Sequence, residues 1–322
     1  MGNANNVYNV NTSGNCNNNN ANNGNRCLPD WIILSAMGLS VRYVTCTIIM
    51  QGDVFQAYTA NNRLVTSNIY AYTTIRAMNY LTYTEAISYE KLYESMMKCK
   101  RNVQWKDSTA NFVLHAVKRI SELSTALQSG TYMQGQPYIF KITTPKPREI
   151  LSVPFRDRVY QRSLNDNIIY PVMTQSFILD NGACQYGKGN MFARQRLVTQ
   201  LRRMVNRYGS DFYILQIDIH GFYKNLSHEY VNNLFKQKLD TETYGHVLKI
   251  LASQYQGDKG YNPGSQMVQI AGVAALNSID HYIKEQLHIE LYERYMDDLI
   301  LGMRTPLQAQ FCKECIEQQL AH

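Results

Sequence analysis

The pattern of apolar and polar positions divides the chain into three parts. In residues 1–30 thirteen side chains are asparagine and few are apolar, so this leader cannot bury enough surface to offset the entropy of ordering it, and we predict that it is disordered. Residues 31–82 are weakly patterned. Their most apolar part, 31–50, is interrupted by Arg42 and four Ser or Thr residues, which favours a buried helix or a pair of strands over a membrane-spanning helix.

Regular periodicity begins near Tyr83 and continues to the end of the chain. Apolar residues three or four apart predict helices at 85–93, 109–127, 156–170, 191–208, 228–239, 266–287 and 307–320. Alternation predicts strands at 138–142, 148–153, 212–219, 290–295 and 299–303. This mixture of helices and strands predicts an α+β fold.

Composition places the chain among globular proteins. Of its 322 residues, 45% are hydrophobic and 18% are charged, which excludes a collagen, a disulfide-rich miniprotein and a chain that is disordered throughout. The net charge of +7 permits a polyanionic partner without requiring one. Seven cysteines with no recognisable secretory leader predict reduced thiols in the cytoplasm, and we expect no membrane partner.

The sharpest chemical signal is a pair of carboxylates in a predicted turn. Asp297 and Asp298 follow Tyr295 and Met296 between two apolar strands. Adjacent carboxylates repel each other, and a divalent cation removes that penalty. A third carboxylate, Asp218, ends another apolar strand, and three carboxylates on neighbouring strand ends suit two cations that catalyse phosphoryl transfer. The alternatives are a chance tetrapeptide and, for Asp218, a helix N-cap or an ordinary strand-end acid.

Four motifs in sequence order resemble those of reverse transcriptases, from about residue 83 to the end. They are a finger motif that contacts the incoming triphosphate at 146–159, a template-side motif at 182–189, the first palm motif at 218–223 and the catalytic hairpin at 295–298. The resemblance implies an RNA-directed DNA polymerase whose residues 83–322 form the fingers and palm of a right-hand fold, with an antiparallel palm sheet.

The resemblance also assigns the metal site. It implies that Asp218, Asp297 and Asp298 hold two Mg²⁺ ions, for which Mn²⁺ can substitute, and that the carbonyl of Ile219 is a further ligand. These three aspartates would be the catalytic residues.

A nucleotide site is implied by the same resemblance. Arg148 and Lys141 would grip the triphosphate, a role that suits guanidinium because its fork matches phosphate oxygens. Tyr223, next to Phe222, falls at the position whose ring excludes a ribose 2′-hydroxyl, which implies selection of deoxynucleotides. The alternative for Tyr223 is a tyrosine that simply fills the core.

Template and primer contacts are implied in three of the motifs, at Arg156, Arg158, Lys188, Tyr295 and Met296. Lys188 would contact a phosphate in a glycine-rich loop that approaches the template, and a purely structural turn is the alternative. For Arg156 the alternative is a solvated or ion-paired residue on the finger surface.

One departure from the family pattern concerns the nascent base pair. Retroviral and group II intron enzymes carry Pro-Gln-Gly before the palm helix, and here Pro263, which precedes Gly264, takes the place of that Gln. Enzymes of diversity-generating retroelements also lack it and carry a Gln five residues beyond the Gly, where this chain has Gln269. Because polar contacts supply most of the selectivity against near-isosteres, we predict error-prone synthesis, with Gly264 and Gln269 in the nucleotide site.

A second departure concerns the thumb. Only 24 residues follow Asp298, too few for the helical thumb that the family needs. We therefore expect a chain truncated before the thumb and weakly active or inactive by itself.

The asparagine-rich leader bears on the biological role. Asparagine codons are rich in adenine, and diversity-generating retroelements keep an adenine-rich template repeat just upstream of the polymerase gene. The leader resembles such a repeat read in frame, which would make residues 31–80 a translated spacer. An ordinary asparagine-rich tail is the alternative.

These features predict error-prone cDNA synthesis in a bacterial or phage-encoded retroelement. The implied partners are template RNA, primer, cDNA, deoxynucleoside triphosphates and a small basic helical accessory protein. The alternatives are a phage-defence reverse transcriptase of the abortive-infection type and a catalytically silent nucleic-acid-binding remnant.

Overall fold

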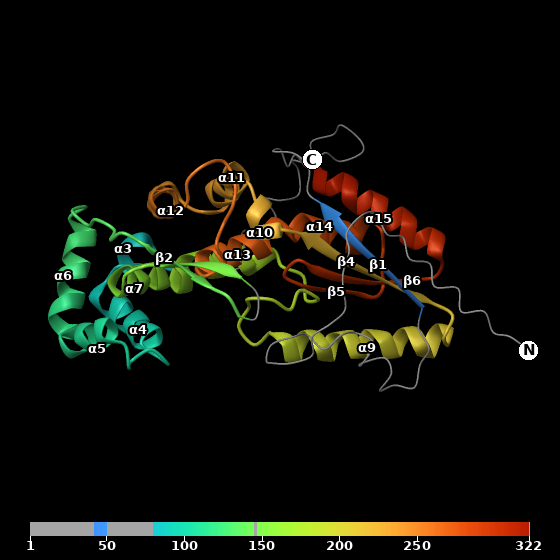
Figure 1. The fold of residues 1–322 in the computed structure, drawn as a ribbon, viewed down its shortest axis with the longest axis horizontal. Coiled ribbons are helices and arrows are strands. Elements are labelled where there is room, and N and C mark those ends of the chain that lie inside the picture. Colours follow the sequence, from blue (N-terminus) through green and yellow to red (C-terminus); the bar gives the residue numbers. More distant parts are fainter. Residues whose placement is uncertain (1–41, 50–79, 145–146, 322) are drawn as a thin grey trace, which may run out of the picture. The chain divides into compact units, whose positions relative to one another are not determined.

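The computed structural model describes residues 42–49, 80–144 and 147–321 (Figure 1). The predicted leader 1–30 and most of the segment 31–82 lie outside the described residues. Within the described ranges the fold mixes helix and sheet, so the predicted α+β class is confirmed at that level. None of the helices in these ranges has the length and apolar character needed to cross a membrane.

The described residues form two compact units. The first contains strand β1 together with residues 177–222 and 276–321, and the second contains residues 80–176 and 223–275. The one-turn helix α10 (Phe222–Asn225) has its first residue in the first unit and its remainder in the second.

A four-stranded sheet forms the centre of the first unit. Its order is β1-β4-β6-β5, with β1 parallel to β4 and the other neighbours antiparallel. The strands are β1 (Arg42–Ile49), β4 (Tyr213–His220), β5 (Tyr292–Tyr295) and β6 (Asp298–Met303). Strand β4 lies inside the sheet, and its apolar residues Ile214, Leu215, Ile217 and Ile219 are buried while Asp218 and His220 at its end are exposed.

Helix α9 (Asn190–Tyr208) packs against the edge strand β5. The side chain of Gln200 substitutes for a missing neighbour strand, because its Nε2 donates to the Tyr292 carbonyl at 3.1 Å and its Oε1 accepts from the Tyr292 N–H at 2.8 Å. A cluster of buried apolar residues joins α9 to β4 and to the residues just before β4 and β5: Leu197, Leu201, Met204, Phe212, Ile214 and Leu291.

Helix α15 (Pro306–Ala321) lies across β1, β4 and β6 (Figure 1). Ahead of β5 the chain forms α14 (Asn277–His281) and the π-helical turn η3 (Tyr282–Gln286). Cys312 and Cys315, which share a helical spacing in α15, are free thiols.

The second unit is mainly helical and carries one exposed hairpin, β2 (Tyr138–Ile142) paired with β3 (Arg148–Ser152). The helices in its first segment, residues 80–176, are α3 (Tyr83–Ala86), α4 (Tyr89–Cys99), α5 (Asp107–Leu114), α6 (Ala116–Gln128), α7 (Phe155–Leu164), η1 (Asn165–Ile169), α8 (Tyr170–Met173) and η2 (Thr174–Ser176). Those after it are α11 (His228–Lys238), α12 (Thr241–Gln254) and α13 (Gln266–Ala275).

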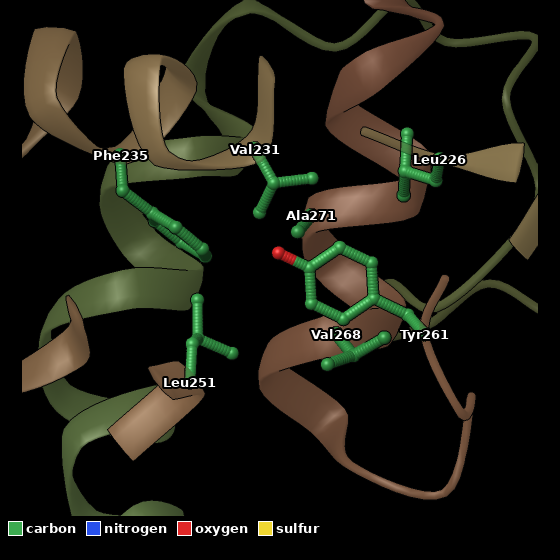
Figure 2. Close-up of a pocket in the computed structure, with 7 residues that line it drawn as sticks. All are labelled: Leu226, Val231, Phe235, Leu251, Tyr261, Val268 and Ala271. Atoms are coloured by element: carbon green, nitrogen blue, oxygen red, sulfur yellow. The ribbon is translucent and has the colours of Figure 1, made fainter. Parts of the chain in front are cut away.

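A small apolar cavity lies among α11, α12 and α13 (Figure 2). Its walls carry no charged group, and they are Leu226, Val231, Phe235, Leu251, Tyr261, Val268 and Ala271. The hydroxyl of Tyr261 points into the space between Val231, Phe235 and Leu251 (Figure 2), and burial raises the pKa of that hydroxyl. We interpret the cavity as a packing defect of the core.

Most predicted elements occur where the periodicity placed them, and the differences have local causes. The helix expected at 85–93 is split, because Ser88 caps a new helix by accepting from the Lys91 N–H. The helix expected at 109–127 breaks at His115, whose φ of −108° and ψ of 29° are not helical. Helix α7 continues into a π-helical segment ahead of Pro171, which lets the helix tolerate a residue without an N–H. Helix α12 was not predicted.

Candidate active site

The three predicted catalytic carboxylates lie together at one end of the first unit's sheet. Asp218 near the end of β4 is paired directly with Asp298, the first residue of β6, which puts their Cα atoms about 5 Å apart. Asp297 occupies the turn before β6, and its carbonyl accepts a hydrogen bond of 3.3 Å from the Ile219 N–H. One strand end and one turn therefore present all three residues in a small volume.

The electrostatics of this end of the sheet are those of crowded acids. Burial raises the pKa of Asp297 above its usual value, and the charge of Asp218 contributes in the same direction. The side chain of Asp218 is exposed, and those of Asp297 and Asp298 are half-buried.

The donor set suits a hard divalent cation. Three carboxylates and the Ile219 carbonyl are oxygen ligands of the kind that Mg²⁺ prefers, and a cation would relieve the repulsion that helps to raise the pKa of Asp297. As their side chains stand, no three Asp, Glu, His or Cys residues in the described ranges already form a closed metal cluster.

The turn that carries Asp297 has a strained first residue. Strands β5 and β6 pair up to Tyr295 and Asp298, so Met296 and Asp297 form a two-residue connection. Met296 has a φ of +59°, and a positive φ at the first central residue alone is the pattern of a type II′ turn, which usually takes glycine there. Such a conformation persists only where its surroundings hold it.

A buried ion pair supplies that support. Arg294 and Asp280 are both fully buried, and the guanidinium donates through Nε and Nη2 to the two carboxylate oxygens at 2.6 Å each. The third nitrogen, Nη1, donates to the Met296 carbonyl at 2.8 Å. Tyr292 adds a bond of 2.6 Å to Asp280 through its hydroxyl. The conformation of the turn is thus tied to a charge pair between β5 and α14.

Sequence reasoning missed Arg294 and Asp280 as parts of this site. The available signal was an arginine inside the predicted strand 290–295, directly before the Tyr-Met-Asp-Asp tetrapeptide. A buried charge needs a partner, but nothing in the sequence pattern identifies that partner.

The predicted template loop packs beside the catalytic turn in the same unit. The Gly182 N–H donates to the Arg294 carbonyl at 2.9 Å, and Cys184 Sγ lies 3.9 Å from Met296 Sδ. The ammonium group of Lys188 donates to three backbone carbonyls, those of Ile178, Leu179 and Asn181, at 3.3, 3.1 and 2.9 Å. In this structure Lys188 therefore stabilises the loop by binding backbone carbonyls of the segment that leads into it.

The predicted triphosphate residues lie in the second unit, on the β2–β3 hairpin. Lys141 is paired with Glu149 and Ile142 with Arg148, so Lys141 and Arg148 occupy adjacent pairs and point to opposite faces of the hairpin. Lys141 and Glu149 also form an exposed ion pair of 3.3 Å.

The two predicted arginines of α7 bind the protein itself. Arg156 donates to the Met133 carbonyl at 2.6 Å and lies 3.3 Å from the buried Asp157 carboxylate. Arg158 contacts the Val153 carbonyl at 3.4 Å. In this structure Arg156 is therefore ion-paired within the protein, which is the alternative to a template contact.

The loop that carries Gly264 lies against β3. Asn262 donates from its side chain to the Glu149 carbonyl and accepts from the Gly264 N–H at 3.1 Å. Gln269 donates to the Pro263 carbonyl at 2.7 Å. Gly264 and Gln269 are thereby joined to the strand that begins with Arg148, and Asn262 is a connecting residue that sequence reasoning did not single out.

Phe222 and Tyr223 have different surroundings. Phe222 is buried, with 2% of its surface exposed. In the second unit the half-buried Tyr223 lies against Gly272 of α13, where an added Cβ would come within 2.7 Å of the tyrosine hydroxyl and 2.9 Å of two ring carbons. Only glycine at position 272 leaves room for the ring as it stands.

Comparisons with known proteins give little additional information. No protein-family model matches the chain, and no curated protein matches it. Among solved structures, the chain is similar to a "Partial Cas6-RT-Cas1--Cas2 complex" and to a "Cas6-RT-Cas1--Cas2 complex", each at 15% identity and a TM-score of 0.41. The matches cover 72% of this chain but only 40% and 25% of those chains, so this chain spans less than half of their length. Similarity at this TM-score supports no inference about function.

Proposed function

We propose that this chain catalyses template-directed nucleotidyl transfer as an RNA-directed DNA polymerase. The observation that carries the proposal is the direct pairing of Asp218 with Asp298 across β4 and β6, with Asp297 in the adjoining turn. The order of the four sequence motifs supports the choice of polymerase over other phosphoryl transferases.

Asp218, Asp297, Asp298 and the Ile219 carbonyl would hold Mg²⁺. When bound, the ions supply Lewis-acid activation of the primer 3′ hydroxyl and stabilise the leaving pyrophosphate. The part of Arg294 is to keep the catalytic turn in its strained conformation through the Met296 carbonyl.

The finer proposal is error-prone cDNA synthesis in a diversity-generating retroelement. It is supported by Pro263, which has no polar side chain to offer a nascent base pair, and by Gln269, which is bonded to the Pro263 carbonyl. The proposed partners are template RNA, a primer, deoxynucleoside triphosphates and a small basic accessory protein.

Primer extension on an RNA template tests the general proposal. We expect extension that requires Mg²⁺ or Mn²⁺ and that falls about a thousandfold in Asp218→Asn and Asp297→Asn, because each change removes several kcal/mol of charge stabilisation. The matched control is Asp211→Asn, an exposed aspartate in the same unit, which should extend like the original chain. Metal-independent extension, or full activity in Asp297→Asn, contradicts the proposal.

Single-nucleotide misincorporation tests the finer proposal. The expected result is frequent misincorporation opposite template bases, with Pro263→Gln more accurate than the original chain. High accuracy in the original chain would reject error-prone synthesis while leaving polymerase activity in place.

A further inference from the structure

The first unit carries an exposed row of arginines that neither its core nor the carboxylate site accounts for. Helix α9 contains five arginines and no acidic residue. One face of the helix is buried by Ala193, Leu197, Gln200, Leu201 and Met204. The side chains of Arg194, Arg202, Arg203 and Arg207 are exposed on the remaining surface.

Ion pairing inside the protein explains only part of this charge. Arg196 pairs with Asp180, and Arg207 pairs with Glu290. Arg194, Arg202 and Arg203 form no hydrogen bond or ion pair with another residue in the part of the chain that the structure describes. Arg203 and Arg207 are four apart on the helix, a spacing at which like charges repel each other, so a surface that served only solubility would gain from interspersed acids.

The positive charge continues past the end of the helix. Arg304, which follows β6, places its guanidinium carbon 3.8 Å from the ring centroid of Tyr208, and that of Arg207 lies 5.3 Å from the same centroid. The negative end of the helix dipole favours cations at this terminus. It does not explain Arg194, which lies near the opposite end.

The basic row begins beside the candidate active site. The template loop leads directly into α9 at Gly189, and the same loop contacts the catalytic turn through Cys184 and Met296. At 1.5 Å per residue the helix extends about 28 Å from that point, and its exposed arginines are spread over about 20 Å. Tyr186 in the loop has 63% of its surface exposed, enough for a base to stack on its ring.

We propose that the exposed face of α9 binds the phosphate backbone of a single nucleic-acid strand that continues from the Asp218–Asp298 site. Guanidinium groups match phosphate oxygens. The exposed arginines run obliquely around the solvent side of α9, from Arg194 on one flank through Arg202 to Arg203 and Arg207 on the other. An unpaired strand is favoured because only its bases are free to stack on Tyr186. The choice of nucleic acid over an acidic protein rests on the proposed function, since the row is continuous with that site.

Fluorescence anisotropy with a labelled oligouridylate of about 16 nucleotides tests the proposal, in EDTA and without nucleotides so that no catalysis is needed. Two phosphate contacts are removed in the double variant Arg202→Glu/Arg203→Glu. We expect its Kd to rise at least about tenfold, and the slope of log Kd against log salt to fall by about 1.4. The variant Arg202→Gln/Arg203→Gln keeps a helix-compatible side chain at both positions, and its Kd should also rise. Circular dichroism checks that the helix is intact in both variants.

The matched control places the same charge change on another helix. Lys236 and Lys238 are exposed near the end of α11 in the second unit, and Lys236→Glu/Lys238→Glu should keep Kd within about twofold of the original value. Unchanged binding in the α9 variants, or equal losses in the α9 and α11 variants, overturns the proposal. Polyglutamate that competes as well as the oligouridylate also overturns it in favour of an acidic protein partner.

Primer extension measured in parallel separates this inference from the proposed function. If no variant extends a primer but binding still depends on Arg202 and Arg203, the polymerase proposal fails and the strand-binding face stands. If the original chain extends primers and the α9 variants bind and extend equally well, the strand-binding face fails and the polymerase stands.

Discussion

Glu293 in β5 is a buried acid without a hydrogen-bonding partner. Only 3% of its surface is exposed, and neither carboxylate oxygen accepts a hydrogen bond from any residue that the structure describes. Burial raises the pKa of Glu293 to about 9, and the charge of Asp180 adds to this, while Arg196 and Lys188 act in the opposite direction. In the folded protein this group therefore carries a proton at neutral pH.

This protonation links stability to pH with a definite sign. Glu293 has an ordinary pKa of 4.5, which applies when the chain unfolds, so between pH 4.5 and 9 the folded state binds one proton more than the unfolded state. The free energy of unfolding must then fall as the pH rises through that window. At about 1.4 kcal/mol per pH unit, the change from pH 6 to pH 8.5 is about 3 kcal/mol.

Glu293→Gln isolates this effect because the amide has nearly the same shape and does not titrate. The difference in unfolding free energy between the variant and the original chain should shift by about 3 kcal/mol in favour of the variant between pH 6 and pH 8.5. Other ionisable groups contribute equally to both proteins and cancel. Urea unfolding curves at the two pH values give the numbers.

The control is Glu290→Gln, which changes an exposed glutamate just before the same strand. Its difference from the original chain should vary by less than about 0.5 kcal/mol over the same range. A difference for Glu293→Gln that does not change with pH, or that changes in the opposite direction, would refute the reasoning about this buried group.

Two further predictions concern packing around the candidate site. Asp280→Asn leaves the fully buried charge of Arg294 uncompensated, so we expect a loss of about 3–5 kcal/mol in urea unfolding; a loss below about 1 kcal/mol would contradict the role of the pair. Gly272→Ala drives a Cβ into the ring of Tyr223 and should cost about 1–3 kcal/mol. Gly245→Ala, in α12 where no atom lies within 4 Å of the new Cβ, should instead stabilise by about 0.5–1 kcal/mol, and equal effects of the two changes would count against the packing argument.

Periodicity predicted well those elements that bury one face, or most of their apolar side chains, along their whole length. Strand β4 and helix α9 are examples, because β4 carries buried apolar residues at Ile214, Leu215, Ile217 and Ile219 and α9 repeats its apolar residues every three or four positions. Breaks inside helices were not predicted. At Ser88 a side-chain cap competes with helix continuation, and such local competition changes the apolar period very little.

The candidate site was predictable in part for a similar reason. Acids at the ends of apolar strands are expected to meet when those strands are neighbours, and Asp218 and Asp298 are directly paired. The present bonds of Lys188 were not predictable, because its three acceptors are backbone carbonyls that the fold of the loop brings together. Composition shows a lysine in a glycine-rich loop, and it does not show where the ammonium group points.

Order along the chain was sufficient to predict a mixture of helix and sheet and the strands that carry acids, and it supplied phosphoryl transfer as a hypothesis, since these depend on residue type and spacing. Distances between elements were decided by the folded chain alone. Arg294 and Asp280 are 14 residues apart and belong to different elements, yet they form a fully buried pair that holds the Met296 carbonyl. The pairing arises because burial removes water from both charges at once, and burial is a property of packing in three dimensions.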